Sequence, residues 1–559
     1  MTGLLLRGGH VLTGDGRPPL RADVLVEGDR VTAVLTDVSD GAVMPGGADG
    51  TVVTGGADGT VVTGGAVMAG AGDVPPGVEV IDASGRLVLP GFVDAHSHAE
   101  GVVFDEQVQL ALLRQGVTTV IGGQDGVSYA PGDGAFASRY FAPINGAHTS
   151  YAGPRVANLL ASYDGRIPLG VAYLVPAGTV RHEVMGGVQR PATAEEIASM
   201  TALVGQGIED GAVGLSTGLD YAPGIFADAA EIAALCAPLA PAGLPYVTHM
   251  RGGYELNAQV GVEEAAVIGR SAGVPVHLSH FHTPAAEAAR LMAWLEGQGV
   301  SGSFDAYPYT RGCSLLAMTM LPPEWNALDP AMAIEQLADP ARREELRRDW
   351  FPQVARNPSL GPEWAELITL AHTAAPQLDW APGLTLAQIA ERRGTDPVDA
   401  ALDVLLLSRL DANVVMAVQD QRPVADLGAL IAHPAHMGGS DGIFIGAHPH
   451  PRARGTFASY LATYVIEHGH LDWPTAVQHL ATAPADRFHL GDRGRIRPGA
   501  IADLILVDPH RVREAASYDS PLELAEGIDD VVVGGRPVLR GGRRTGETPG
   551  GGVRATAAP

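Results

Sequence analysis

The stretch LVLPGFVDAHSHAE, residues 87–100, decides how the chain is expected to fold around it. Its apolar residues predict a short buried strand that starts near Phe92 and leads to His96 and His98. Because alternate residues of a strand point to the same side, both imidazoles face one way. Such a pair makes half of a metal site, although two hydrogen-bonded surface histidines would give the same local pattern.

The length and charge of the chain narrow the classes of function. A chain of 559 residues is expected to hold one large domain with one or two additions. Its net charge of −26 argues against nucleic acid or an anionic membrane surface as a partner. An anionic substrate would need a local cation. All 37 basic residues are arginine, because the sequence contains no lysine.

The sequence also indicates a cellular location. The two cysteines, Cys236 and Cys313, are too few for a disulfide framework. The first residues lack a basic start followed by a long apolar run, and no stretch approaches the roughly 18 apolar residues of a membrane span. A cytoplasmic protein is therefore expected. No pattern in the sequence indicates an oligomeric state.

Strand and helix patterns divide the chain. Residues 1–90 consist of short strands and turns, and the sequence GADGTVVTG occurs twice in tandem within 47–64, predicted to be a duplicated loop or hairpin without chemistry. In 91–480, apolar strands alternate with Ala/Leu-rich helices, which predicts a (β/α)8 TIM-like barrel interrupted by a helical insertion at about 320–400. The strands are predicted at 92–97, 116–123, 211–217, 245–250, 275–280, 301–309, 413–418 and before 438–442.

The two ends of the chain are expected to meet. Residues 481–545 return to strand-and-turn character, so they should pair with residues 1–90 in one small β-sandwich domain. The glycine-rich tail, 546–559, is predicted to be disordered.

Polar side chains gather at the predicted ends of the barrel strands, where barrel enzymes build their active sites. These residues are His96, His98, Asp125, His249, His280 and Asp441. Four imidazoles and two carboxylates have the ligand types of a mononuclear or dinuclear zinc site. Each residue alone could equally be a core histidine or a turn aspartate beside glycine.

The sequence resembles the amidohydrolase superfamily in PGFVDAHSHAE, in GVTTV and in its closing segment, 481–508. Within the superfamily it looks like the N-acyl-D-amino-acid deacylases, or D-aminoacylases. The stretches that carry this resemblance are GGQDGVSYAP (122–131), GLSTGLDYAPG (214–224), VTHMRGG (247–253), HLSHFH (277–282), DAYPYTRGCS (305–314), GGSDG (438–442) and HPHPRARGTF (448–457).

The resemblance implies a zinc-dependent hydrolase that cleaves the N-acyl amide of a D-amino acid, with one or two Zn²⁺ ions. By matching motif positions, His249 and His280 would hold the tightly bound zinc, while His96 and His98 would form a neighbouring site. Asp441 would be the general base, which passes the proton of the attacking water to the leaving amine. The D configuration rests on the resemblance alone.

The sequence departs from the family at one metal-site position. Asp125 stands where relatives usually carry a cysteine ligand, and carboxylate is a harder ligand than thiolate. The absence of lysine excludes the other common superfamily solution, a carbamylated lysine bridge. If two metals are bound, Asp125 and solvent are the expected bridges.

Several residues are predicted to bind substrate. Arg452 is the candidate for the α-carboxylate, since guanidinium can donate two parallel hydrogen bonds; without the resemblance it would be interpreted as an exposed loop arginine. Tyr221, Tyr307 and Ser314 match substrate-contacting positions of the family. His282 stands where relatives commonly carry lysine, which implies a weaker carboxylate anchor and an altered substrate preference.

Other functions also fit the sequence. A cyclic-amide hydrolase of the dihydropyrimidinase type or a dipeptidase acting on D-residues would keep the fold and change the bond. A different class is a catalytically inactive relative that serves as a binding or structural protein. The presence of all four histidines and Asp441 argues against this alternative, while Asp125 leaves it open. Cys313 has no evident base beside it, so it is interpreted as a packing residue.

Overall fold

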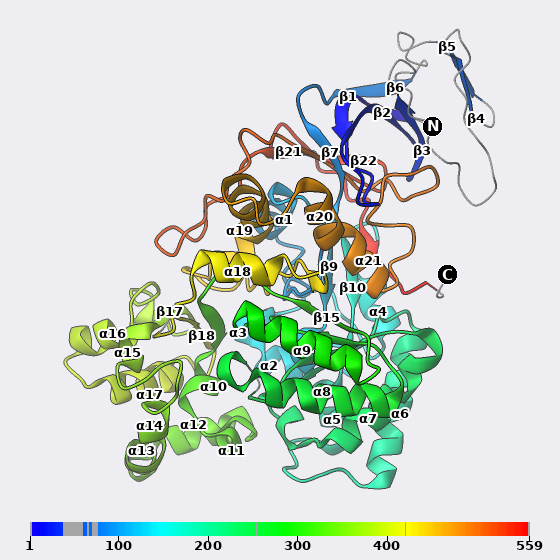
Figure 1. Cartoon of the computed structure of the whole chain (residues 1–559). Coiled ribbons are helices and arrows are strands. Elements are labelled where there is room, and N and C mark those ends of the chain that lie inside the picture. Colours follow the sequence, from blue (N-terminus) through cyan, green and yellow to red (C-terminus); the bar gives the residue numbers. More distant parts are fainter. Residues whose placement is uncertain are drawn as a thin grey trace.

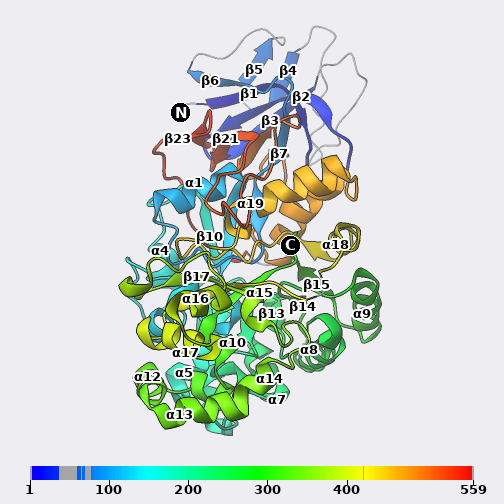
Figure 2. The same ribbon diagram turned by 90° about the vertical axis from the view of Figure 1, so that its left-hand side faces the viewer.

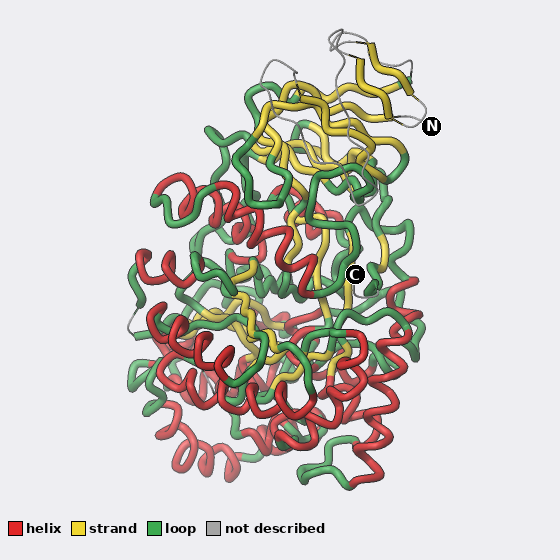
Figure 3. The backbone as a smooth tube through the Cα atoms, turned by 45° about the vertical axis from the view of Figure 1, so that its right-hand side comes forward, coloured by secondary structure: helices red, strands yellow, loops and turns green. Residues whose placement is uncertain are grey.

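The computed structural model describes residues 3–36, 60–63, 66–69, 77–252, 254–419 and 421–556. The molecule has a central barrel, a β-domain at one end and a largely helical insertion lying away from that domain (Figures 1 and 2). In Figure 3 the β-domain strands form a separate group, and a second group of strands lies inside a layer of helices.

The inner strands form two parallel sheets that face each other as arcs of a barrel, in agreement with the predicted fold class. They fall into two arcs: β8 (Phe92–Asp94), β9 (Val117–Gly122) and β10 (Gly170–Tyr173), then β11 (Val175–Pro176), β12 (Leu215–Gly218), β13 (Tyr246–His249), β14 (Val276–Leu278), β15 (Gly302–Asp305) and β19 (His436–Met437). The Val213 N–H donates to Tyr173 O (2.9 Å) at one junction. At the other, the Ala95 N–H donates to Gly438 O (2.9 Å), so backbone hydrogen bonds link the two arcs at both junctions.

Helices connect the strands and pack around them (Figure 1). They are α1 (Glu106–Arg114), α2 (Ala135–Tyr140), α3 (Ala142–Asn145), α4 (Val156–Ala161), α5 (Ala177–Met185), α6 (Ala194–Glu209), α7 (Ala229–Cys236), α8 (Ala258–Ala272), α9 (Ala285–Gly297), α18 (Val424–Ile431), α19 (Arg452–Ser459), α20 (Trp473–Val477) and α21 (Ala483–Arg487). Local signals fix their ends. Thr193 and Glu196 form a capping box that starts α6. Gly273, with φ of 69°, ends α8.

The insertion has its own sheet and its own hydrophobic core. It consists of β16 (Gly312–Leu315), α10 (Leu316–Met320), α11 (Pro323–Asn326), α12 (Pro330–Ala338), α13 (Pro340–Glu345), α14 (Phe351–Val354), α15 (Trp364–Leu367), β17 (Ile368–Thr373), α16 (Leu386–Arg393), α17 (Pro397–Leu407) and β18 (Ala412–Met416). The three strands form an antiparallel sheet in the order β16-β18-β17. A separate cluster of buried side chains packs the helices against it.

The predicted set of barrel strands was wrong at one position. The stretch 413–418 supplies β18 of the insertion sheet, and the third barrel strand is β10, at 170–173. Both segments are short, apolar and largely buried. Periodicity therefore cannot distinguish a parallel barrel strand from an antiparallel strand in a second core.

The β-domain draws its strands from both chain ends. It contains β1 (Gly3–Val11), β2 (Leu20–Glu27), β3 (Arg30–Thr36), β6 (Val78–Asp82), β7 (Leu87–Pro90), β20 (Leu504–Val507), β21 (Ile528–Val533), β22 (Arg536–Arg540) and β23 (Arg543–Arg544). The strands predicted as a sandwich form one continuous nine-stranded sheet. Arg30 of β3 also pairs with Ile501, so the sheet folds over one shared core.

The tandem repeat lies mostly outside the described residues. In the second copy, β4 (Thr60–Thr63) pairs as an antiparallel hairpin with β5 (Ala66–Ala69), which follows the repeat. Among the described helices, none combines the length and apolar character needed to cross a bilayer.

The described part of the C-terminal tail, residues 546–556, is ordered, which corrects its predicted disorder. Gly551 and Gly552 form β24, which pairs with Gly170 and Val171 at the edge of β10. A Cβ on Gly550 would lie 2.1 Å from Leu169 O, so the close approach requires glycine. The glycines that suggest a flexible linker by composition therefore let the tail pack against the barrel.

We expect Val553→Ala to destabilise the protein. Val553 is 5% exposed and packs with Val93, Ile121 and Ala172 in a buried cluster. Losing two methyl groups there should lower the free energy of unfolding by about 1–2 kcal/mol, measured as a shift of the urea midpoint. Glu547→Ala, a change at an exposed residue of the same tail, is the control. An unchanged midpoint in Val553→Ala would mean that the tail does not pack in solution.

Candidate metal centre and substrate pocket

The first two histidines are held at the end of β8 by contacts across the barrel junction. The buried carboxylate of Asp94 accepts hydrogen bonds from the Ser440 backbone N–H (2.8 Å) and hydroxyl (2.5 Å). The Asp441 N–H donates to His96 O (2.8 Å). These bonds fix the loop that carries Asp441 beside His96 and His98, whose side chains are almost completely buried.

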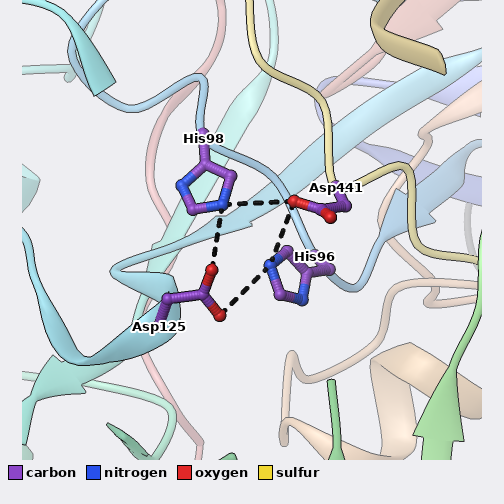
Figure 4. A group of neighbouring side chains, drawn as sticks. All are labelled: His96, His98, Asp125 and Asp441. Carbon is purple, nitrogen blue, oxygen red and sulfur yellow. Dashed lines mark ion pairs between the residues drawn. The ribbon is translucent and has the colours of Figure 1, made fainter. Parts of the chain in front are cut away.

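Four predicted ligands meet around one point (Figure 4). Asp441 Oδ1 lies 3.6 Å from His96 Nε2 and 3.3 Å from His98 Nε2. Asp125 Oδ1 lies 3.7 Å from His96 Nε2, and its Oδ2 lies 3.5 Å from His98 Nε2. One ligand atom from each of these residues falls within 4.8 Å of the others.

Asp125 also belongs to a second group, with the two other histidines. Its Oδ1 lies 3.7 Å from His280 Nε2 and 3.9 Å from His249 Nδ1, and those two nitrogens are 3.0 Å apart. The structure thus brings together all six side chains that the sequence singles out. Asp125 is the residue common to both groups.

Three residues of this cluster adopt left-handed backbone conformations. The φ angles are 55° at Asp125, 35° at His280 and 48° at Asp441. Such conformations cost energy in residues other than glycine and concentrate at functional sites, where surrounding structure enforces them. At Asp125 the surroundings include Gly218, where a Cβ would lie 2.1 Å from the Asp125 carbonyl oxygen.

The cluster fits a bound cation. Nε2 of His96 and Oδ1 of Asp125 are buried without a hydrogen-bond partner among the described residues. Buried polar atoms rarely remain unpaired, and a metal ion would satisfy these. Burial raises the pKa of Asp125, but His96, His280 and His98 outweigh it and hold the pKa well below its ordinary value. The carboxylate is therefore an anionic ligand.

A second layer of polar groups, not predicted from the sequence, orients the imidazoles. Each contacts the ring nitrogen that faces away from the cluster. The pairs are His96 Nδ1 with Asp305 Oδ2 (3.5 Å), His98 Nδ1 with Asn145 Oδ1 (2.9 Å) and His249 Nε2 with Asp220 Oδ2 (3.4 Å). Such partners fix the tautomer of metal-binding histidines. Asp305 could have been noticed because it ends β15, as the ligands end other strands.

Arg452 lies inside the site and is completely buried at the start of α19, so it is not an exposed loop arginine. Its Nη2 forms an ion pair with Asp441 Oδ2 at 2.8 Å. The guanidinium carbon lies 4.5 Å from the centre of the Tyr307 ring. Nε and Nη1 have no hydrogen-bond partner among the described residues. Two donors therefore remain for a ligand.

The other predicted substrate residues surround the same space. The Tyr221 ring lies 4.8 Å from that of His249, and Ser314 is close to Tyr221. The His282 ring lies 4.3 Å from that of Tyr307. Burial lowers the pKa of His282 well below its ordinary value, and Arg422 lowers it further.

Cys313 and a nearby cavity complete the surroundings. Burial raises the pKa of Cys313 to about 12, so the thiol is not a nucleophile at neutral pH. A cavity of about 290 Å³ lies between the barrel and the insertion. Its lining includes Tyr140, Ala222 and Leu328, which places one wall directly after Tyr221.

Comparison with known proteins places this site in a class of enzymes. The amidohydrolase family model matches residues 79–539. The chain therefore belongs to the amidohydrolase superfamily and, within it, to the family of the D-aminoacylases. Family membership and the cluster together make it a hydrolase with a metal-dependent site.

Particular relatives span nearly the whole chain. A D-aminoacylase of Alcaligenes xylosoxydans xylosoxydans is 30% identical and covers 99% of this chain and 98% of its own length. A D-aminoacylase structure that addresses the role of a binuclear metal centre superimposes with a TM-score of 0.76, at 27% identity and 99% coverage of both chains. An N-acyl-D-glutamate deacylase of Bordetella bronchiseptica, complexed with zinc and a phosphonate inhibitor, gives 0.77 at the same identity and coverage.

Proposed function

We propose that this protein hydrolyses the N-acyl amide bond of N-acyl-D-amino acids to a carboxylic acid and a D-amino acid. The observation that carries the proposal is the contact between Arg452 and Asp441. This contact places the guanidinium of Arg452, which can bind the substrate's carboxylate, beside the carboxylate of Asp441, which can accept and donate a proton. The full-length similarity to D-aminoacylase supports the same reaction.

The proposed cofactor is zinc, as one or two ions. His249, His280 and Asp125 would hold one ion, and His96, His98, Asp125 and Asp441 offer ligands for a neighbouring one. A bound metal acts as a Lewis acid on the scissile carbonyl and makes water a stronger acid. The support for zinc is the likeness to the zinc-complexed deacylase.

Asp441 is proposed as the general base. Burial raises its pKa, but Arg452 and the imidazoles outweigh burial and lower the pKa to about 2. The ionised carboxylate can take a proton from the attacking water and then donate it to the nitrogen of the leaving amine. One carboxylate serves both steps because the proton gained in the first is the one needed in the second.

Arg452 is proposed to bind the substrate's α-carboxylate through its unpartnered donors. Tyr307 supports the guanidinium from one side. Tyr221, Ser314 and His282 line the remaining space, and their substrate contacts are part of the proposal. A cytoplasmic location stays a prediction from the sequence.

A substrate panel tests the proposed function. N-acetyl-D- and N-acetyl-L-amino acids would be assayed with added Zn²⁺, Co²⁺ and Mn²⁺, with cyclic amides and D-residue dipeptides alongside. We expect turnover of the D-series. Turnover of only cyclic amides or dipeptides would reassign the bond. Substoichiometric metal with no turnover of any substrate would indicate an inactive relative.

We expect Arg452→Ala to impair binding of substrates that carry a carboxylate. KM should rise about 30–100-fold for N-acyl-D-amino acids, because charge-assisted hydrogen bonds to the carboxylate are lost. The corresponding amides lack that carboxylate and should lose far less. Arg452→Ala also removes the positive charge beside Asp441. Any loss in kcat from that cause should be the same for the acid and for the amide. Equal changes in KM for acid and amide would reject the carboxylate role.

A further inference from the structure

His282 receives a hydrogen bond from an arginine that no sequence motif identified. Arg422, just before α18, lies with Nη2 at 2.6 Å from His282 Nδ1. Its Nη1 donates to Thr283 O, also at 2.6 Å. The two contacts clamp the guanidinium onto consecutive residues that follow β14.

This hydrogen bond fixes which ring nitrogen carries the proton. A guanidinium has donors and no acceptor, so Nδ1 of His282 must be the acceptor. A ring whose Nδ1 accepts carries its proton on Nε2. His282 is therefore held as the tautomer that donates from Nε2.

The Nε2 donor is buried and has no partner among the described residues. The whole side chain is 8% exposed. Its ring lies 4.3 Å from Tyr307, the same ring that Arg452 covers at 4.5 Å. His282 and Arg452 thus share one aromatic neighbour, and each keeps an unused donor there.

Acidic side chains hold Arg422 in place. Its guanidinium lies 3.6 Å from Glu255 and 3.6 Å from Asp426. Asp426 is itself anchored, because it accepts a hydrogen bond from the Ala285 backbone N–H (3.1 Å). These partners balance the positive charge of Arg422, so it acts at the substrate pocket through His282.

We propose that Arg422 is a positioning residue that presents His282 Nε2–H as a hydrogen-bond donor to the substrate's carboxylate, beside Arg452. The inference rests on the proposed function for the identity of that carboxylate. It assigns to His282 the role of an uncharged donor whose other ring nitrogen is held by the cation of Arg422.

Binding of the product amino acid tests this pairing without requiring turnover. D-leucine and D-leucinamide, which differ at the carboxylate, would be titrated calorimetrically into the metal-loaded protein. For Arg422→Met we expect the Kd of D-leucine to rise about tenfold, the effect of one hydrogen bond to a charged group. The Kd of D-leucinamide should change less than about twofold. Arg422→Lys, which keeps a donor for Nδ1, should retain most of the wild-type affinity.

Changes at His282 provide a second route if Arg422→Met folds poorly. His282→Gln keeps an N–H donor and should bind D-leucine close to wild type, while His282→Phe should lose about tenfold. In the double variant Arg422→Met/His282→Phe, the losses should not add, because both remove the same bond.

The outcomes separate this inference from the proposed function. Equal losses for D-leucine and D-leucinamide, an Arg422→Lys variant as defective as Arg422→Met, or no binding of D-leucine to wild type would overturn the role of the pair. A protein that shows the expected binding pattern but hydrolyses no N-acyl-D-amino acid would reject the proposed reaction and leave the carboxylate pocket standing.

Discussion

Replacing Asp441 with asparagine is expected to reduce kcat by about 10³-fold or more, because general acid–base catalysis contributes up to about 10⁴-fold. Asparagine keeps the size of the side chain and cannot accept a proton from water. The ion held by His249, His280 and Asp125 should stay bound, since none of these three ligands changes. Elemental analysis and kcat measured on the same preparation would test both statements.

The contact with Arg452 adds a second expectation for this variant. Asparagine leaves the guanidinium without its anionic partner, so KM for N-acyl-D-amino acids should fall or stay constant while kcat collapses. Asp503→Asn is a matched control, because Asp503 is also buried and pairs with an arginine, Arg493, at 3.2 Å outside the site. Retained turnover in Asp441→Asn would remove Asp441 from the role of general base.

The candidate site could be located from the sequence because a parallel barrel gathers its strand ends on one face. His249 ends β13, Asp125 follows β9 and His280 follows β14, so each lies where a strand gives way to a loop. Their convergence needs no knowledge of side-chain rotamers. The positions of the strand ends do not predict which residue contacts each ring nitrogen of these histidines.

The residues that orient the histidines of the site could not be predicted from the sequence in this way. Arg422 and His282 are 140 residues apart, with the whole insertion between them. Their contact depends on how α18 packs after the insertion returns to the barrel. Asp220, in the loop after β12, and Asn145, at the end of α3, likewise contact histidines from positions that are set by tertiary packing. A sequence motif can therefore identify a metal ligand, but the residues that orient this ligand are known only from the folded structure.

The errors in the fold have a similar cause. The segments β10 and β18 look alike because each is a short buried run, and the partner strand alone decides which sheet receives it. At the tail, Gly550 and Gly551 allow a backbone approach that composition cannot distinguish from flexibility. Local sequence fixes what a segment can form, and the available neighbour decides what it does form.

Asp125→Ala is expected to have the largest effect on metal binding. It removes the one side chain that both ligand groups share, and it leaves four imidazoles without their nearest shared carboxylate. Metal content after dialysis should fall well below one equivalent. The stabilisation that added Zn²⁺ gives to wild type in a thermal melt should disappear with it. An Asp125→Ala protein that retains its metal through dialysis would contradict the shared-ligand role.

Asp125→Cys separates the chemistry of the ligand from its position. Thiolate is softer than carboxylate, so the variant should favour Zn²⁺ over Mn²⁺ more strongly than wild type does. The measurement is competition between the two ions, read as metal content at equilibrium and as the shift in melting temperature that each ion gives. An unchanged preference would mean that the four histidines set metal selectivity. A shift toward Zn²⁺ would show that the ligand atom at position 125, which both metal-binding groups share, sets the metal preference. The carboxylate of wild type would then be what adapts this centre to harder ions than thiolate would favour.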